Sequence, residues 1–165
     1  MSRLFVAVWP SAEVVSMLAG LSRVERPGVR WLGAEHWHVT LRFLGEADEA
    51  LAMSRLDDLV AAPCEARFSG PVGRLGRSAL VVPVAGLEEL AAAVGAAMVG
   101  VGDQPERPWL GHLTLARLKN VPACSLVEDA VVGRWPVDRV ALVRSELSSS
   151  GARYHTLREV PLCFG

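Results

Sequence analysis

The sequence has no long apolar run and almost no net charge. Its most apolar stretch, residues 91–102, is short and interrupted by glycine, so no segment approaches the roughly 18–20 residues that a membrane-spanning helix requires. The 17 lysines and arginines nearly balance the 18 aspartates and glutamates, which leaves a formal net charge of −1. This balance argues against a large basic face for gripping duplex nucleic acid, because such a face neutralises many phosphates. A small anionic ligand held by a few residues is still compatible with it.

Cysteine is also scarce. Cys64, Cys124 and Cys163 are widely spaced and form no CxxC motif, so neither a disulfide framework nor a cysteine-rich zinc site is indicated. The opening residues, MSRLFVAVWP, contain one basic residue and an apolar run that stops at Pro10. They are typical of a first strand rather than of a secretory signal. We therefore expect a cytoplasmic protein with reduced thiols.

What is present predicts a folded α+β chain. Its 165 residues are 51% hydrophobic and 21% charged, a composition that excludes a disordered protein and suffices for one core. We expect a single domain, 1–165, without an internal linker. The hydrophobic spacing and the flanking Gly, Pro and Ser residues predict strands at 4–9, 37–44, 65–69, 79–84, 112–118, 139–147 and 152–160. They predict helices at 12–21, 48–62 and 87–100 and a short helix that starts near Ser125.

The informative feature is a repeat. Residues 37–44 read WHVTLRFL, and residues 111–118, 74 positions later, read GHLTLARL. The chain has only four histidines, and two of them stand in these copies as His-x-Thr-Leu, at His38–Thr40 and His112–Thr114. Each copy lies on an expected strand, and the interval is close to half of the chain. The repeat therefore predicts two similar lobes that each contribute one equivalent strand.

This spacing suits acid–base chemistry. Residues i and i+2 of a strand share one face, about 6.5–7 Å apart, so each imidazole points into the same space as its threonine hydroxyl. An unperturbed histidine titrates near pH 6.5, so one of the pair can be protonated while the other is neutral. An acid, a base and two hydroxyl donors around one cavity suit phosphoryl transfer without a metal.

Other interpretations of these residues are open. Each His-x-Thr pair taken alone could be ordinary strand surface. His36 forms His-x-His with His38, and His112 could complete a three-histidine zinc site; otherwise His36 lies at the rim. The Gly73–Ser78 loop, with two arginines, could form a backbone nest for an anion or a plain hairpin loop. His155 is expected to be a surface or strand-packing histidine.

The paired motifs resemble those of the two-histidine phosphoesterases, and within them the bacterial RNA 2′,3′-cyclic phosphodiesterases, long named 2′-5′ RNA ligases. The similarity extends over residues 3–8, 31–46, 107–117 and 142–157. It implies a bilobal α+β fold with pseudo-two-fold symmetry, in which two antiparallel sheets face a central cleft and the helices lie outside. It also implies metal-independent opening of a terminal 2′,3′-cyclic phosphate to a 2′-phosphate.

By position, the resemblance makes His38 and His112 the catalytic pair. We assign His38 as the acid and His112 as the base; exchanging the two roles would leave the pH profile unchanged. Thr40 and Thr114 would then hold the phosphate oxygens. Substrate contacts are expected from Arg117, which would pair with phosphate, from Phe43, which would stack on the terminal base, and from Tyr154, on ribose or base. Arg117 and Phe43 each lie five residues after a histidine. Strict alternation would put them on the opposite face, so these roles require a bulge or the end of a strand.

One position departs from the family pattern. The family usually has proline directly before the second catalytic histidine, and this chain has Gly111. A glycine loosens the entry to a strand, which affects the positioning of His112 more than its chemistry.

The sequence thus predicts a monomeric cyclic phosphodiesterase that needs no cofactor or metal and acts on RNA 3′ ends or nucleoside 2′,3′-cyclic phosphates. Two alternatives remain. One is the reverse reaction, which joins a cyclic phosphate to a 5′-hydroxyl in a 2′-5′ linkage. The other is a module that binds phosphates or RNA ends without turnover.

Overall fold

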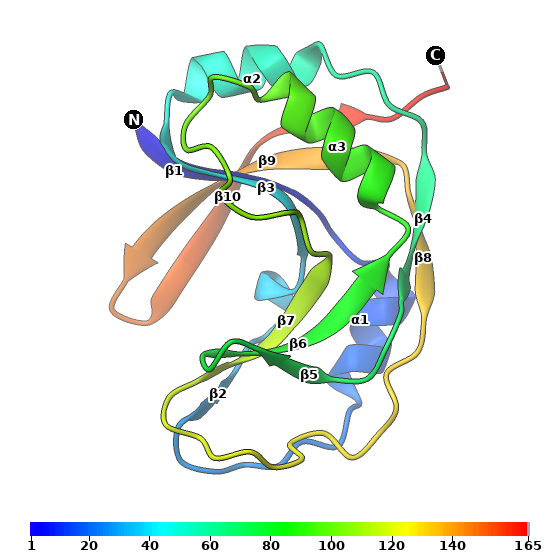
Figure 1. Cartoon of the computed structure of the whole chain (residues 1–165), viewed down its shortest axis with the longest axis vertical. Coiled ribbons are helices and arrows are strands. Elements are labelled where there is room, and N and C mark those ends of the chain that lie inside the picture. The colour runs from blue at the N-terminus through cyan, green and yellow to red at the C-terminus, as the bar shows by residue number, and fades with distance from the viewer. Residues whose placement is uncertain (165) are drawn as a thin grey trace.

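The chain forms one strongly curled sheet with three α-helices outside it (Figure 1). The computed structural model describes residues 1–164. The strands are β1 (Ser2–Val8), β2 (Val29–Trp31), β3 (Val39–Ala47), β4 (Cys64–Phe68), β5 (Gly73–Leu75), β6 (Ala79–Ala85), β7 (His112–Leu118), β8 (Arg134–Val137), β9 (Arg139–Ser148) and β10 (Gly151–Pro161). The helices are α1 (Ala12–Ala19), α2 (Glu49–Asp57), α3 (Glu88–Ala97) and the short 3-10 turn η1 (Ala34–His36).

The strand order is β10-β9-β1-β3-β7-β6-β4-β8, with β2 added to β7 and β5 added to β6. All of these pairings are antiparallel, so the expected α+β class is confirmed. The two sheets that we expected are joined into one, through a single register pair between Val39 of β3 and Leu113 of β7. The sheet curls at this junction, and side chains from both groups of strands line the hollow that results. The pseudo-two-fold relation of the lobes stays a prediction.

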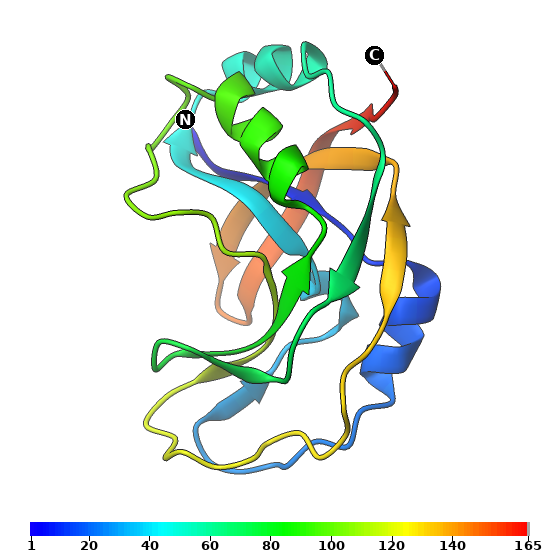
Figure 2. The ribbon, with the colours of Figure 1, turned by 45° about the vertical axis from the view of Figure 1, so that its right-hand side comes forward.

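Local signals in the sequence start two of the helices. The Ser11 hydroxyl accepts the Val14 N–H at the start of α1, and the Asp48 carboxylate accepts the Leu51 N–H at the start of α2, which are capping bonds. Asp48 is the N-cap that the sequence predicts for the second helix, but α2 ends at Asp57 and not near residue 62. Helices α2 and α3 lie together across one end of the sheet, at the top of Figure 1, whereas α1 lies beside β8 (Figure 2).

The expected helix near Ser125 is wrong, because residues 122–133 run as an extended segment. The Val24 N–H donates to the Leu126 carbonyl at 2.9 Å, and the Ser22 N–H donates to the Asp129 carboxylate at 2.7 Å. The backbone groups of this segment thus find their hydrogen-bond partners in residues 22–24 and not in a helical turn of their own. The sequence also left β2 and β8 unassigned; β8 lies at the edge of the sheet, where its proline is tolerated.

The alternate residues of the two motif strands fill one core. Val39 and Leu41 of β3 and Leu113 and Leu115 of β7 are at most 2% exposed and belong to the same apolar cluster. Burying a side chain of this size contributes about 1.5–3 kcal/mol, so the two motif strands are firmly held. The residues between them face the hollow. None of the helices in residues 1–164 is long and apolar enough to cross a membrane.

Candidate active site

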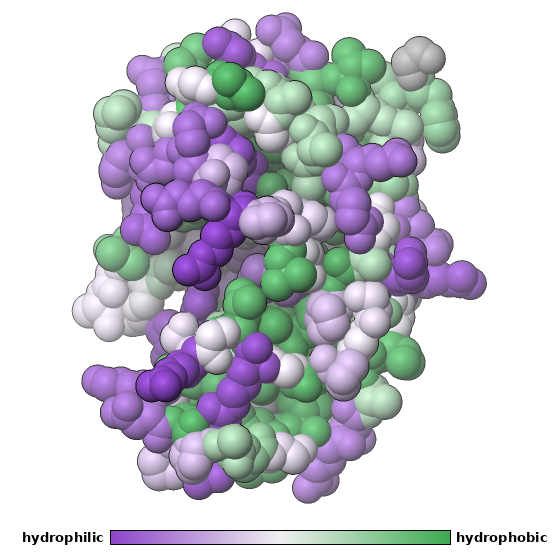
Figure 3. Space-filling view, viewed as in Figure 1, coloured by the Kyte–Doolittle hydropathy of each residue, from purple (hydrophilic) through white to green (hydrophobic). Residues whose placement is uncertain are grey.

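A pocket of about 360 Å³ occupies the hollow of the curled sheet. The surface is hollowed at the left of Figure 3, between the β9–β10 hairpin and β5. The pocket brings together all of the residues that the sequence singles out as site residues: His38, Thr40, Phe43, His112, Thr114, Arg117 and Tyr154. They come from β3 or the residue before it, from β7 and from β10, so segments far apart in the chain meet here.

Both motif histidines are oriented in the same way. Nδ1 of His38 lies 2.8 Å from the His36 carbonyl oxygen, and Nδ1 of His112 lies 2.8 Å from the Leu110 carbonyl oxygen. A carbonyl oxygen only accepts, so each Nδ1 carries the proton and each Nε2 of the neutral ring is left with its lone pair. Nε2 of His38 lies 3.1 Å from Oγ1 of Thr40, whose hydroxyl can donate to it. The two imidazoles can therefore each exchange one proton through Nε2.

A bulge follows the threonine in both motif strands. Along β3, the register with β1 passes from Thr40 to Arg42 and leaves out Leu41. Along β7, the register with β6 passes from Thr114 to Ala116 and leaves out Leu115. An extra residue shifts the alternation by one position. This shift turns Phe43, three residues after Thr40, and Arg117, three residues after Thr114, toward the same pocket as the histidines.

Aromatic rings surround His38. The rings of Phe5, Trp9 and Tyr154 lie 5.0, 5.5 and 5.4 Å from the His38 ring, measured between centroids. Burial among these rings lowers the pKa of His38 to about 4, and the charges of His112 and Arg117 act in the same direction. Desolvation disfavours the charged imidazolium. His38 is thus neutral at pH 7 in the ligand-free protein.

Arginines lie at the same pocket as the aromatic rings. Arg117 lines the pocket, and the guanidinium of Arg3 lies 5.1 Å from the centroid of the Phe43 ring. Burial raises the pKa of Tyr154, while Arg117, Arg3 and a third arginine partly offset this rise. The Tyr154 hydroxyl therefore stays protonated and can donate. These charges suit an anionic ligand at the bottom of the pocket.

His36 is tied to the hairpin. Its Nε2 lies 2.6 Å from the carbonyl oxygen of Ala152 on β10, to which it donates, and its Nδ1 lies 3.4 Å from a Glu35 carboxylate oxygen. Both ring nitrogens thus have partners within the protein. No group of three or more His, Cys, Asp or Glu residues among residues 1–164 is placed to hold a metal ion.

The Gly73–Ser78 segment forms a hairpin and does not present a nest of arginines. Arg74 donates from Nη1 to the Val121 carbonyl and from Nη2 to the Pro122 carbonyl, each at 2.6 Å. This arginine is therefore occupied in holding the segment after β7 and is not free for phosphate. Leu75 and Ala79, on β5 and β6, contribute to the pocket wall instead.

The first strand contributes residues that the sequence did not single out. Arg3 and Phe5 line the pocket, and Trp9 packs edge-on against His38. Arg3 and Phe5 lie at alternate positions of β1 and so share one face, and Trp9 follows one residue after the strand ends. That alternation was the available signal, but the predominantly apolar sequence of β1 obscured it.

A hydrogen bond ties the two motifs together. The indole N–H of Trp109, three residues before His112, donates to the Thr40 carbonyl at 2.9 Å. Gly111 lies between the Trp109 ring and β6, and its carbonyl accepts the Val84 N–H at 2.9 Å. A Cβ atom on Gly111 would collide with the Val84 carbonyl oxygen and would lie 2.7 Å from the Trp109 ring. The glycine thus allows the close approach that places His112.

Replacing Gly111 by alanine should therefore damage the protein. The methyl group must push β7 or Trp109 aside, which we expect to cost about 1–3 kcal/mol of unfolding free energy, as overpacking does. Urea unfolding measures this loss. Gly95→Ala, where an added Cβ atom meets nothing within 4 Å, is the control for one added methyl group. An unfolding free energy of Gly111→Ala equal to that of the unsubstituted protein would contradict the close packing.

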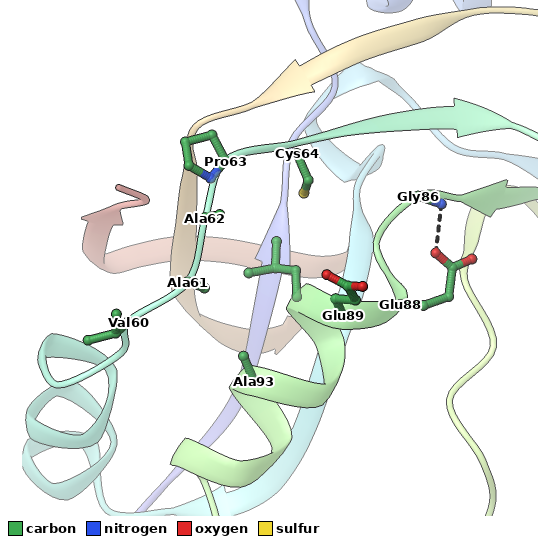
Figure 4. Close-up of a pocket in the computed structure, with 10 residues that line it drawn as sticks. Val60, Ala61, Ala62, Pro63, Cys64, Gly86, Glu88, Glu89 and Ala93 are labelled. Carbon is green, nitrogen blue, oxygen red and sulfur yellow. Dashed lines mark hydrogen bonds between the residues drawn. The ribbon is translucent and has the colours of Figure 1, made fainter. Parts of the chain in front are cut away.

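A different cavity, of about 540 Å³, lies between residues 60–64 and the start of α3 (Figure 4). It holds Cys64, Glu88 and Glu89 and none of the predicted site residues. Glu88 accepts the Gly86 N–H at 2.8 Å, the dashed bond in Figure 4. Burial and the two glutamates raise the pKa of the Cys64 thiol, which makes it a poor nucleophile. The smaller histidine pocket is the better candidate for catalysis because its groups can transfer protons.

Known proteins match this chain over almost its whole length. A family model described as the 2′-5′ RNA ligase superfamily matches residues 10–148. A relative from Thermus thermophilus, named RNA 2′,3′-cyclic phosphodiesterase, is 32% identical over 97% of this chain and 90% of its own. A relative of the same name from Methanocaldococcus jannaschii is 23% identical over 95% of this chain and 99% of its own.

Solved structures agree on the fold. A crystal structure described as a phosphoesterase superimposes with a TM-score of 0.84 at 22% identity, covering 99% of each chain. Escherichia coli LigT complexed with 3′-AMP superimposes with a TM-score of 0.79 at 21% identity, covering 98% of each chain. At these identities the similarity establishes the architecture.

Proposed function

The chain belongs to the 2′-5′ RNA ligase superfamily, and we propose that its two His-x-Thr motifs together open a terminal 2′,3′-cyclic phosphate to a 2′-phosphate. The three curated relatives are all named RNA 2′,3′-cyclic phosphodiesterase, and this chain is a phosphodiesterase of the same kind. One observation carries the proposed mechanism. His38 and His112 face one pocket, each with Nδ1 bound to the carbonyl two residues earlier.

The reaction needs one proton taken and one proton given. A water oxygen attacks phosphorus in line with the P–O3′ bond while the base removes a water proton through Nε2. As the P–O3′ bond breaks, the acid delivers its Nε2 proton to O3′, which leaves a 2′-phosphate and a 3′-hydroxyl. The hydroxyls of Thr40 and Thr114 donate to the non-bridging oxygens, and Arg117 pairs with their charge. If a 5′-hydroxyl attacked in place of water, the same base and acid would give a 2′-5′ linkage, with O3′ again leaving as a hydroxyl.

The environment of His38 supports a reversal of the roles that we assigned from the sequence. A pKa of about 4 leaves His38 neutral at pH 7, which is the form that a base requires. His112 is the second histidine of the same pocket, so the role of acid falls to it. We therefore assign His38 as the base that activates water and His112 as the acid that protonates O3′.

A substrate with a good leaving group tests this assignment. In a 3′-deoxynucleoside 2′-(4-nitrophenyl phosphate), nitrophenolate departs without a proton, so the acid becomes dispensable. We expect His112→Ala to recover most of its loss on this substrate, whereas His38→Ala stays impaired by ~10²-fold or more. The release of nitrophenolate reports the rate. The opposite pattern would restore the original assignment, with His38 as the acid.

Removal of metal tests the mechanism as a whole. We expect turnover of a nucleoside 2′,3′-cyclic phosphate in excess EDTA at the rate seen without it, because imidazoles and hydroxyls suffice. Chromatography of the nucleotide products measures the rate. Loss of turnover that added zinc restores would favour a metal site. Binding without turnover at any pH would favour a module for phosphates or RNA ends.

We also propose that one copy of the chain acts alone, as a single two-lobed domain in the cytoplasm. Both histidines and both threonines come from one chain, so the pocket needs no second subunit to complete its set of groups. Cys64, Cys124 and Cys163 are free thiols, as is usual in a reducing compartment. Gel filtration combined with light scattering tests the monomer, and a dimeric mass at assay concentration would contradict it.

A further inference from the structure

A second groove adjoins the histidine pocket. Its volume is about 520 Å³, and the segment 103–110, α3 and the outer part of β3 line it. It shares Thr40, Phe43, Leu75 and His112 with the histidine pocket. We propose that this 103–110 groove binds the nucleotide directly upstream of the terminal one, so that the preferred substrate is an RNA end of at least two nucleotides. The inference rests on the proposed function.

The shape of the groove comes from the way the sheet curls. Strands β3 and β7 pair only at Val39 and Leu113, and the segment 103–110 fills the opening between them. The Trp109 bond to the Thr40 carbonyl fixes this segment beside the catalytic residues. An RNA whose terminal phosphate lies between His38 and His112 would therefore have a wall of the groove directly beside its terminal nucleotide. The volume lies in the range of ordinary ligand sites.

Exposed apolar side chains gather at this place. Phe43, Leu75 and Leu110 line the groove and are 46%, 37% and 60% exposed. Leu147, which is 80% exposed, lines the adjoining histidine pocket. Exposed apolar groups that cluster around a pocket mark a binding surface. A nucleobase offers the flat apolar face that such a surface takes up, without a preference for sequence.

The charge of the groove suits a single phosphodiester. Arg107 lies in its wall and forms no ion pair within residues 1–164. Arg42 donates to the Gln104 side chain at 3.0 Å and to the Asp103 carbonyl at 3.4 Å, which holds the segment in place. Arg42 and Arg107 line the groove together with one acidic residue, Asp103. This small excess of positive charge beside an apolar surface fits one backbone phosphate and one base, and the near-zero net charge of the chain argues against many phosphate contacts along the RNA.

A substitution on helix α3 can fill the groove. Gly95 lines it, and a Cβ atom added there meets nothing within 4 Å. Gly95→Phe should therefore project a ring into the groove without disturbing the core, and glycine is not needed inside a helix. Ala96, the next residue of α3, is exposed and lies outside the groove. Ala96→Phe is the matched control.

The experiment compares a nucleoside 2′,3′-cyclic phosphate with a dinucleotide that ends in the same cyclic phosphate. We expect the unsubstituted protein to show a kcat/KM at least about tenfold higher for the dinucleotide. Tenfold corresponds to 1.4 kcal/mol, within the range for stacking one base. Gly95→Phe should lower the dinucleotide value to that of the mononucleotide, and Ala96→Phe should keep the preference.

Three results would overturn the inference. The unsubstituted protein could treat the two substrates alike, or Gly95→Phe could lower both by the same factor. Alternatively, Gly95→Phe could impair only the joining of a 5′-hydroxyl RNA, which would assign the groove to a second strand. Binding of the mononucleotide and dinucleotide 2′-phosphates, followed by tryptophan fluorescence, gives a readout without turnover. A protein that turns over neither substrate but still binds the dinucleotide more tightly would refute the proposed function and support the groove.

Discussion

His38→Ala and His112→Ala should each lower kcat on a nucleoside 2′,3′-cyclic phosphate by at least ~10²-fold, the lower end of what general acid–base catalysis contributes. Each histidine performs one of two linked proton transfers, so the loss of either leaves O3′ without its proton or water without its base. The double variant should lose little more than a single one, because groups that act as a unit are not additive. Steady-state assays on the folded variants measure these losses.

His155→Ala is the control for this series. This histidine lies on β10, outside the pocket, with its side chain 39% exposed and 3.3 Å from a Glu146 carboxylate oxygen. Its removal should leave kcat within a factor of about two, since substitutions at such surface positions change little. Full activity in either His38→Ala or His112→Ala would remove that histidine from the mechanism.

Acidification should destabilise the protein through His38. The pKa of His38 is about 4 in the folded chain against 6.5 for the free side chain, so the fold favours the neutral ring. Between pH 6.5 and 4, the unfolded chain takes up a proton at this position and the folded chain does not. The free energy of unfolding therefore falls as pH falls through this window. At 1.36 kcal/mol for each pKa unit, the loss of unfolding free energy is about 3 kcal/mol.

Urea unfolding of the protein and of His38→Gln at pH 7, 5 and 4 isolates this contribution. Carboxylates also titrate in this window, but they do so in both proteins. The difference between the two unfolding free energies should narrow as the pH falls, because glutamine takes up no proton. A difference in unfolding free energy that stays the same from pH 7 to pH 4 would show that the aromatic enclosure does not lower the pKa of His38.

The residues that line the candidate site could be predicted from the sequence because the His-x-Thr motif repeats. His38 with Thr40, and His112 with Thr114, follow directly from the alternation of a strand, and the Asp48 cap follows from local hydrogen bonding. The structure places all four of the motif residues in one pocket. Signals of this kind depend only on residues a few positions apart.

What depends on distant contacts could not be predicted. Alternation along each strand suggests a bulge, but its position, at Leu41 in β3 and at Leu115 in β7, is visible only in the register with β1 and β6. The enclosure of His38 requires Phe5 and Tyr154, from opposite ends of the chain, and our proposal that His38 is the base rests on it. The segment near Ser125 has sequence compatible with a helix, but bonds to residues 22–24 hold it extended.

The most direct test of the central claim is the identity of the product formed from a nucleoside 2′,3′-cyclic phosphate in ¹⁸O-labelled water. Two histidines that assist attack in line with the P–O3′ bond should give only the 2′-phosphate with one ¹⁸O atom, seen by ³¹P NMR as a single isotope-shifted signal. That signal should disappear in both His38→Ala and His112→Ala over the same time. A 3′-phosphate, a mixture of isomers, or an unchanged signal in either variant would contradict the account.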